Sequence, residues 1–245
     1  MNASRTARER ARAELTREIK EEARRQLRIS GAQGLSLRAV ARELGLASSA
    51  LYRYFPSRDR LLTELIIDAY DALGERVERA GAPRAPEAPD AADAGVHRAR
   101  WRARCTAVRA WALAHPHEYA LVYGSPVPGY EAPESTIGPA SRAPVALLEV
   151  LRDAARAGAL HLPGDALAPD LHEQAARTAE LIGMDLPGPV LVRGVAAWTQ
   201  LLGIVGAELF GHLTGSMDPA GPFFAHTVEL MADSVGLPPA ARTDL

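Results

Sequence analysis

The chain has 245 residues, of which 47% are hydrophobic and 24% are charged, and its formal net charge is −2. This composition excludes a wholly disordered chain, because it supplies enough apolar side chains for one large core or two smaller ones. Aromatic residues make up only 5% of the chain, whereas Ala, Leu and Arg abound, so the balance of propensities predicts an all-α protein.

Cysteine usage and apolar segments indicate the compartment. Cys105 is the one cysteine of the chain, so it forms no internal disulfide and completes no metal site, as a reducing cytosol allows. No segment reaches about 18 uninterrupted apolar residues, and the Arg-rich first residues lack a signal-peptide pattern. We therefore expect a soluble, cytoplasmic protein that does not enter a membrane.

Charge is divided unevenly along the chain. Residues 1–60 contain 14 Lys and Arg against 7 Asp and Glu, a balance of +7, whereas the remaining residues carry −9. A basic head on an acidic body suits a protein in which one end approaches phosphate groups. A solvated basic helix would give the same pattern, so charge alone leaves both interpretations open.

The first predicted element is a long helix over residues 5–27, which we expect to pack across the helices that follow. Residues 1–10 are charged and only weakly amphipathic, so they are expected to form either a mobile basic arm that touches a nucleic-acid backbone or a disordered tail. Apolar residues recur every four positions along the helix: Ala11, Leu15, Ile19, Ala23 and Leu27.

Two short helices around a tight corner are predicted over 37–44 and 47–54. Ser36 is a good N-cap for the first helix, and Gly45 can take the left-handed conformation that the corner demands. Leu46 would plug this corner. Inward-facing residues at helical spacing are Leu37, Val40, Ala41, Leu44, Leu51 and Phe55. Outward-facing residues of the second helix are Ala47, Ser48, Ser49, Tyr52 and Tyr54.

These two segments also carry a family resemblance. The sequences SLRAVARELG at 36–45 and LYRYFPSRDRLL at 51–62 resemble the tetracycline-repressor (TetR) type of regulator, over about residues 14–70. The resemblance implies a three-helix N-terminal DNA-binding unit followed by a larger helical domain that binds a small ligand and dimerises. Tyr54 stands where the family often has His, and Arg58 where it commonly has Lys; each keeps a group able to contact a phosphate oxygen.

The predicted DNA contacts divide into two groups. Contact with the DNA backbone is expected from Ser36, Arg38, Tyr54 and Arg58, and contact with base edges from Ala47, Ser48, Ser49 and Tyr52. The second group has few hydrogen-bond donors, so specificity would also depend on thymine-methyl packing and DNA shape. Tyr52 could instead be a packing residue. A dimer would place its two reading helices about one DNA turn, roughly 34–36 Å, or more apart, which implies an inverted-repeat operator.

A connecting helix is predicted over 57–80, with Ser57 as its cap and Asp59 in the first turn, where negative charge suits the helix dipole. The following stretch, 81–95, is rich in Pro and Ala and indicates an exposed linker or loop. We place the domain boundary there. The predicted domains are 1–80 for DNA binding and 96–237 for ligand binding and dimerisation.

The second domain is expected to be helical over 96–115, 144–157, 169–183, 187–213 and 221–235. A Pro- and Gly-rich stretch at 124–144 is expected to be irregular and could form a lid over a cavity. Within 187–213, apolar residues follow one side and four glycines lie among them, which would let another helix approach closely. We expect 187–213 and 221–235 to form a homodimer interface, with a monomer core as the alternative. The apolar side of 187–213 is Leu191, Val195, Trp198, Leu202, Val205, Leu209 and Leu213.

This domain also resembles a subset of TetR-type ligand-binding domains. In that subset a helix ending in His-Pro, a Tyr-containing turn, a Pro/Gly loop and a Trp…His-Gly helix recur. The corresponding residues here are His115-Pro116, Tyr123-Gly124 and Trp198…Leu202-Gly203. Leu202 stands where the subset has His, so any polar contact of that His has no counterpart here.

Aromatic side chains of the helical domain are the predicted ligand-binding residues: Trp111, Tyr119, Tyr123, Trp198 and Phe210. Each could equally be an ordinary core residue. A small, mostly apolar effector that binds between these helices would tilt the 57–80 helix, respace the DNA-reading helices and shift DNA affinity between two states.

Metal and catalytic motifs are not expected. His115 and His117 do not share a helical face and have no clustered third ligand nearby, and neither a nucleophile elbow nor a phosphate or dinucleotide loop occurs. The sequence thus predicts a ligand-responsive regulator, most simply a repressor, with no metal and no cofactor. The alternative from another class is a helical small-molecule-binding or catalytic protein whose basic head is not sequence-specific for DNA.

Overall fold

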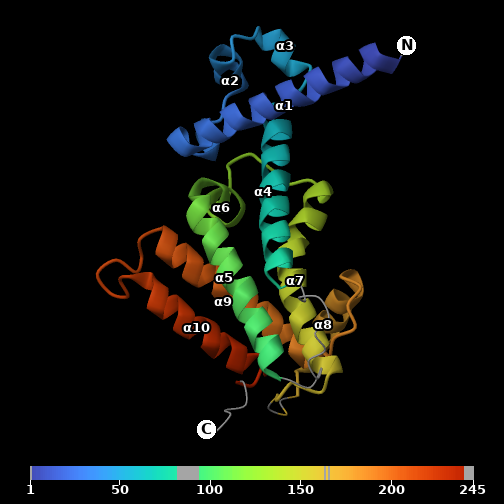
Figure 1. Cartoon of the computed structure of the whole chain (residues 1–245), viewed down its shortest axis with the longest axis vertical. Coiled ribbons are helices and arrows are strands. Elements are labelled where there is room, and N and C mark those ends of the chain that lie inside the picture. Colours follow the sequence, from blue (N-terminus) through green and yellow to red (C-terminus); the bar gives the residue numbers. More distant parts are fainter. Residues whose placement is uncertain (1, 82–93, 163, 165, 240–245) are drawn as a thin grey trace. The chain divides into compact units, whose positions relative to one another are not determined.

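The computed structural model describes residues 2–81, 94–162, 164 and 166–239 (Figure 1). Within these residues the secondary structure consists of ten α-helices and two 3₁₀ helices, without a strand, so the all-α prediction is confirmed. The chain divides into two compact units: Met1–Tyr70 with His115–Pro139, and Asp71–Ala114 with Ala140–Leu245. We call them the head unit and the body unit.

These units differ from the predicted domains 1–80 and 96–237. The long helix α4 (Arg58–Ala80) contributes residues to both units, which divide between Tyr70 and Asp71. The predicted linker at 81–95 falls largely on 82–93, which lie outside the described residues.

The head unit is built from short elements around α1. Its helices are α1 (Asn2–Ser30), η1 (Ala32–Gly34), α2 (Leu37–Glu43), α3 (Ser48–Tyr52), the first part of α4, α6 (Pro116–Tyr123) and η2 (Glu134–Thr136). Residues 2–10 belong to α1, so the prediction of an arm or a disordered tail there is wrong. The separate helix α6 was not predicted; Pro116 occupies its first turn, where a missing N–H costs nothing.

Apolar stripes on α1, α2, α3 and α4 form the core of the head unit. Ile19, Ala23 and Leu27 of α1 are buried as predicted, but Ala11 is exposed, so the buried part of this stripe starts at Leu15, which is partly buried. Small Ala carries too little apolar surface to fix where a stripe ends. Buried core residues of the other three helices include Leu37, Val40, Ala41, Leu51, Leu61, Leu62, Leu65 and Ile66.

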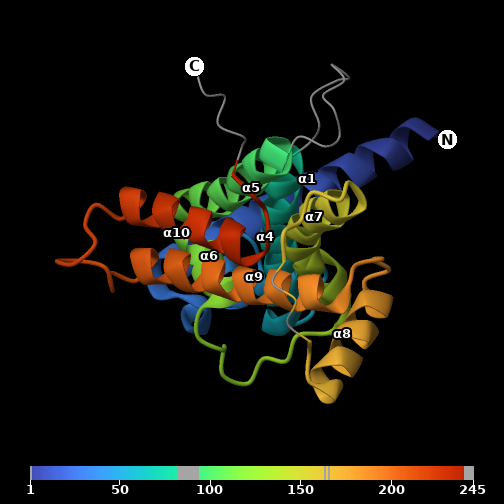
Figure 2. The same ribbon diagram turned by 90° about the horizontal axis from the view of Figure 1, so that it is seen from below.

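The body unit contains most of the longer helices after α4. They are α5 (Ala94–Ala114), α7 (Ile137–Arg156), α8 (Pro169–Leu181), α9 (Gly188–Leu209) and α10 (Ala220–Ser234). Residues 124–133 are irregular as predicted, but helix α7 starts at Ile137 and contains Pro144 in its interior, so the predicted irregular stretch is too long. Figures 1 and 2 show α9 and α10 side by side, and both pack on α5.

The apolar side predicted for 187–213 as a homodimer interface coincides only in part with the face that α9 turns to the core. Val195 of the predicted stripe is 44% exposed, and Trp198 and Leu202 are only partly buried. Gly194 is buried, and a side chain at this position would lie 2.5 Å from Leu148 Cδ2 of α7. The close approach predicted for a glycine thus serves packing within the chain at this position. The core-facing residues of α9 are Val190, Leu191, Gly194, Ala197, Leu201, Ile204 and Val205.

Helix α9 is also long and apolar enough to cross a membrane, judged by length and composition alone. A core helix of a water-soluble protein meets the same criterion. In this chain α9 packs against α5, α8 and α10, and part of its apolar surface stays uncovered.

Candidate DNA interface

The corner between α2 and α3 has the predicted geometry. The Ser36 side chain caps α2, with its Oγ accepting a hydrogen bond from the Ala39 N–H at 3.4 Å. Gly45 follows the helix with φ of +66°, a left-handed conformation that glycine adopts without strain. The Leu46 N–H then donates to the Ala41 carbonyl at 2.8 Å, and Leu46 packs against the head core. The corner is therefore held by both backbone and apolar contacts.

Helix α3 is shorter than predicted but keeps the expected inner and outer faces. Leu51 is fully buried and Phe55, just after the helix, is 3% exposed. The side chains expected to read base edges all face solvent: Ala47, Ser48, Ser49 and Tyr52. Because the inner face of α3 is packed in the head core, the exposed outer face of this helix is held in a fixed position relative to that core.

Tyr54 departs from the predicted outward orientation. It is partly buried and packs against the head core, and the Arg12 guanidinium of α1 lies 5.5 Å from the centre of its ring. Such a cation–π contact stabilises by about 0.5–1 kcal/mol at exposed sites. Arg12 and the exposed Arg53 are basic groups close to α3 that the sequence analysis did not select. The helical spacing of Arg12 from Ile19 was the signal that could have found it.

Arg58 contacts the backbone of the head unit. Its Nε donates to the Leu35 carbonyl at 3.2 Å and its Nη2 to the Ala32 carbonyl at 2.7 Å. These bonds hold the turn that precedes the capping residue Ser36. Arg38, by contrast, is exposed on α2. Of the two arginines predicted to contact the DNA backbone, Arg38 is therefore more exposed to solvent than Arg58.

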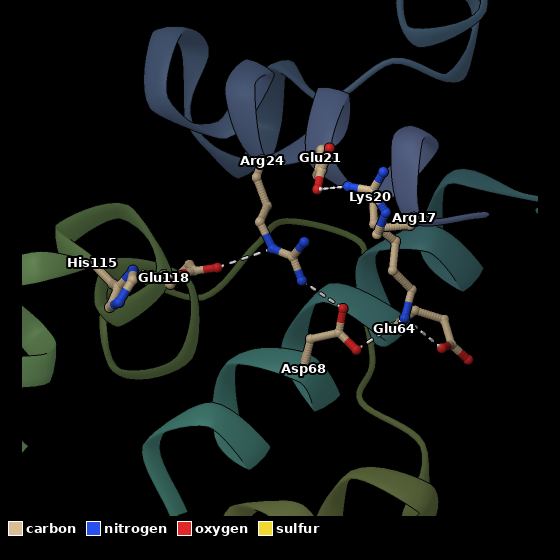
Figure 3. A network of polar contacts seen from close by, with 8 residues as sticks. All are labelled: Arg17, Lys20, Glu21, Arg24, Glu64, Asp68, His115 and Glu118. Carbon is tan, nitrogen blue, oxygen red and sulfur yellow. Dashed lines mark hydrogen bonds and ion pairs between the residues drawn. The ribbon is translucent and has the colours of Figure 1, made fainter. Parts of the chain in front are cut away.

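A network of ion pairs connects α1 with α4 and α6 (Figure 3). The Lys20 ammonium lies 2.9 Å from Asp68 Oδ1 and 3.2 Å from Glu64 Oε2. The Arg24 guanidinium bridges two elements, with 2.6 Å to Asp68 of α4 and 3.0 Å to Glu118 of α6. These side chains are partly shielded from solvent, so the pairs are less screened than exposed ones.

Glu118 has a second partner at the start of α6. His115 Nδ1 lies 3.0 Å from Glu118 Oε2, so one carboxylate contacts both the residue before α6 and Arg24 of α1. A displacement of α6 would therefore move Glu118 relative to its partner Arg24 on α1. The ion pairs of α1 with α4 and α6 could not be predicted from the sequence, because the paired residues are 44 to 94 positions apart.

Two of the predicted ligand-binding residues, Tyr119 and Tyr123, lie together on α6. Their ring centres are 5.2 Å apart, and Tyr70 of α4 packs edge-on against Tyr123 at 5.9 Å. Burial raises the pKa of Tyr119 to about 12. Burial, together with the neighbouring Tyr70 and Tyr119, also raises the pKa of Tyr123. All three phenols therefore stay neutral at physiological pH.

The other three predicted ligand-binding residues belong to the body unit. Trp111 of α5 is buried, and Trp198 of α9 is partly buried. Phe210 follows α9, is 48% exposed, and has its ring centre 6.5 Å from that of His212. Phe210 thus lies at the surface of the chain rather than among core side chains.

No group of three or more His, Cys, Asp or Glu residues that could hold a metal ion occurs among the described residues. Cys105 is fully buried on α5, and burial raises the pKa of its thiol.

An anchored second helix with an exposed outer face, following a glycine corner in a basic unit, defines a helix-turn-helix DNA-binding protein. Two family models match the chain. Residues 19–65 match "Bacterial regulatory proteins, tetR family" and residues 101–231 match "Tetracyclin repressor-like, C-terminal domain".

Known proteins agree with this match. HTH-type transcriptional regulator Rv1816 of Mycobacterium tuberculosis and HTH-type transcriptional regulator Mb1846 of Mycobacterium bovis are each 38% identical over 225 residues, covering 91% of this chain and 93% of each relative. Among solved structures, that of SCO4313 is 32% identical, with a TM-score of 0.72 over 92% of this chain and 98% of that chain. A protein from Rhodococcus sp. RHA1 is 25% identical, with a TM-score of 0.61 over 90% and 93%. The chain belongs to the TetR family of DNA-binding transcriptional regulators, which are not enzymes.

Proposed function

We propose that this TetR-family regulator is a cytoplasmic repressor that binds an inverted-repeat operator as a homodimer and is released by a small, mostly apolar effector. The observation that carries the proposal is the exposed face of α3, held on a buried Leu51 and preceded by the glycine corner. A groove-reading helix needs both a rigid support and an uncovered outer surface.

Base recognition is assigned to Ala47, Ser48, Ser49 and Tyr52, which are exposed at and after the start of α3. Two serine hydroxyls and one phenol supply the hydrogen-bonding groups, and Ala47 offers a methyl contact for thymine. With so few donors, part of the sequence preference would come from DNA shape.

Contacts with the DNA backbone are assigned to Ser36, Arg38, Tyr54 and Arg58. Arg38 is the most exposed of the four, so it is the strongest candidate for a direct phosphate contact. Arg58 would act chiefly by holding the turn before α2, because two of its nitrogens already donate to carbonyls of this turn. Replacing either residue should weaken binding evenly across sequences; a changed base preference at one position would contradict its assignment.

A homodimer interface is assigned to α9 and α10. Val195 of α9 is 44% exposed and Leu230 of α10 is 50% exposed, and partly buried apolar residues lie at helical spacing from them: Trp198 and Leu202 on α9, and Phe223 on α10. An apolar surface of this kind is covered in a stable helical bundle by another helix pair. The apolar composition of α9 beyond its core face is accounted for if a second copy covers the outer face.

Effector binding is assigned to five aromatic residues: Trp111, Tyr119, Tyr123, Trp198 and Phe210. Within the head unit, α6 carries both the Tyr119–Tyr123 pair and Glu118, the partner of Arg24 on α1. A ligand that displaces either tyrosine would move α6 and thereby change the restraint on α1. The resemblance to the ligand-binding subset with a Trp…His-Gly helix belongs to this proposal, with Leu202 replacing its His.

The direct test is a gel-shift titration with the DNA upstream of the gene that encodes this chain, with an unrelated duplex as competitor. We expect a complex that resists the unrelated duplex and a protected region with inverted-repeat symmetry. Equal affinity for both duplexes would refute sequence-specific regulation.

The effector assignment is tested on the preformed complex with a panel of small apolar compounds. A compound that releases the DNA from the wild-type chain should lose potency when Tyr123 is replaced by Leu, whereas DNA affinity without the compound should change little. If no compound in the panel releases the DNA and none shifts the melting temperature of the chain, the proposed effector response is wrong.

A further inference from the structure

The N-terminal turns of α1 continue beyond the part of the helix that packs on the head core. Buried or partly buried residues of the core-facing stripe start at Leu15 and Ile19. Residues 7–14 are all exposed, and Figure 1 shows this end of α1 running on past α3. A helix of this length that leaves its domain core needs a partner or a solvent-compatible surface on every side.

The stripe that faces the head core is continued by arginines. Arg12 precedes Ile19 by seven positions, and Arg8 precedes Leu15 by seven positions. Seven residues make nearly two helical turns, so these four side chains leave the helix on the same side. This end of α1 has two acidic residues: Glu14 lies on another face and pairs with Arg17, and Glu9, next to Arg8, lies roughly 100° around the helix from it. The side of α1 directed toward the head is therefore apolar along the core and basic beyond it.

One contact fixes where the basic part of this side lies. The Arg12 guanidinium is placed over the ring of Tyr54, two residues after the end of α3. The exposed Arg53 lies between α3 and this contact in the sequence. The basic stripe of α1 thus lies beside the segment that directly follows α3, within one unit.

We propose that the first turns of α1, through Arg8 and Arg12, form a rigid helical extension of the DNA interface that binds phosphates beyond those reached from α2 and α3. This inference rests on the proposed function, because it takes the same duplex as the partner. Arginine side chains on the side of α1 that faces the head core favour an anionic partner. Because this side of α1 adjoins the segment after α3, we take the partner to be the phosphate backbone of the same duplex rather than an acidic protein segment.

The size of the extension follows from helix geometry. From Leu15 to Arg8 the helix advances by about 10 Å, at a rise of roughly 1.5 Å per residue. This distance corresponds to about three base pairs along a duplex at roughly 3.4 Å per step. The footprint of a dimer would then be longer by about three base pairs at each end than α2 and α3 alone account for.

The experiment compares the full-length chain with an Arg8→Ala, Arg12→Ala double variant on the duplex that the wild-type chain selects from a random-sequence library. Dissociation constants are measured over about 50–200 mM salt, where each neutralised phosphate contributes about 0.9 to the slope of log K against log salt. The matched control is Arg76→Ala with Arg177→Ala, which removes the same charge from exposed positions in the body unit. Arg8→Ala alone separates phosphate binding from any effect on Tyr54.

The proposal predicts that the slope of the double variant falls by up to about 3.6, because each of two protomers would neutralise two fewer phosphates. The hydroxyl-radical footprint should shorten at both ends, and base preference should stay unchanged. Arg8→Ala should give part of the same reduction. The inference is wrong if slope and footprint of the double variant equal those of the control while the wild-type chain binds its selected duplex normally. If the wild-type chain selects no sequence at all, the proposed function itself fails, and the inference fails with it.

Discussion

The head unit and the body unit differ in where their arginine side chains lie. In the head unit none of the arginines whose side chains are described is buried: they are exposed or, like Arg24 and Arg58, partly buried with carboxylate or backbone carbonyl partners. The body unit buries two arginines, Arg98 at 7% and Arg104 at 4% side-chain exposure, and leaves most of the exposed large apolar side chains at its surface. The head unit thus exposes its arginines, whereas the body unit exposes large apolar side chains.

The buried arginines of the body have a structural reason. Arg98 donates to Glu229 at 2.8 Å, to Asp233 at 2.6 Å and to the Leu237 carbonyl at 2.6 Å, which ties α5 to the end of α10. Burial lowers the pKa of Arg104, whereas at Arg98 burial is outweighed by the hydrogen bonds to Asp233 and Glu229, which raise the pKa. Such pairs specify one arrangement of helices more than they add stability.

The largest effect should come from breaking the apolar core that supports α3. Leu51→Ala removes a fully buried side chain, and we expect a loss of about 3 kcal/mol in unfolding free energy, since the remaining cavity adds to the transfer cost. Urea denaturation followed by circular dichroism measures it. Ser49→Ala, on the exposed face of the same helix, should change base preference and leave the denaturation midpoint unaltered. Equal stability of Leu51→Ala and wild type would show that α3 is not anchored.

A charge on the apolar surface of the body should come next. Leu230→Asp on α10 would place an unpaired carboxylate in the proposed dimer interface and raise the dimer dissociation constant by about 100-fold. Sedimentation equilibrium measures this constant. Leu181→Asp is the matched control, because Leu181 is 82% exposed on α8. If both variants dimerise like wild type, α9 and α10 do not form the interface.

The buried tyrosine hydroxyls of the head unit should make its free energy of unfolding depend on pH in the alkaline range. Because the pKa of Tyr119 is raised to about 12 by burial, its neutral form is favoured by folding, and this contribution is complete below about pH 10 and lost as pH rises toward 12. The loss should be on the order of 2 kcal/mol. Tyr119→Phe should abolish it while leaving stability at pH 7 nearly unchanged. Identical alkaline unfolding of both chains would contradict this account.

The smallest effect concerns the ion pairs between α1, α4 and α6. Arg24→Ala should cost about 1 kcal/mol, because its two carboxylate partners lie on different elements and are partly shielded. Arg25→Ala should cost less, since Arg25 is more exposed and pairs with Glu22 on its own helix and, at 3.4 Å, with the exposed Glu43 of α2. Thermal denaturation distinguishes the two variants. A larger loss for Arg25→Ala would overturn the role given to Arg24.

The fold was largely predictable from periodicity, and the exceptions have physical causes. Pro144 suggested a break, yet it lies inside α7, where neighbouring Ala143 and Leu147 are buried and offset the cost of a missing backbone hydrogen bond. On α9, apolar residues occur on every side, so spacing alone could not tell the core face from the outer face. The apolar side of 187–213 that was predicted as a homodimer interface therefore combined residues of both faces: Leu191 and Val205 are buried, whereas Val195 is exposed.

The candidate site was predictable where it depends on local chemistry. Ser36, Gly45 and the faces of α3 followed from capping, backbone conformation and spacing. The contacts of Arg58 and Glu118 could not be predicted, because each joins residues far apart in the sequence. Helical spacing indicates on which side of α1 Arg12 lies, but not that Tyr54 is its partner. Side chains that bridge elements become visible only when those elements are placed together.

The central claim is that α3 enters the major groove in two copies, and a tethered cleavage reagent tests it most directly. Ser49→Cys would be the only accessible thiol, because Cys105 is fully buried, so an iron chelate can be attached at position 49 alone. On the selected duplex we predict two clusters of strand cleavage in the major groove, about one helical turn or more apart, related by two-fold symmetry. Cleavage no stronger than that from a chelate attached through Arg177→Cys on α8, or a single unsymmetrical cluster, would contradict the account.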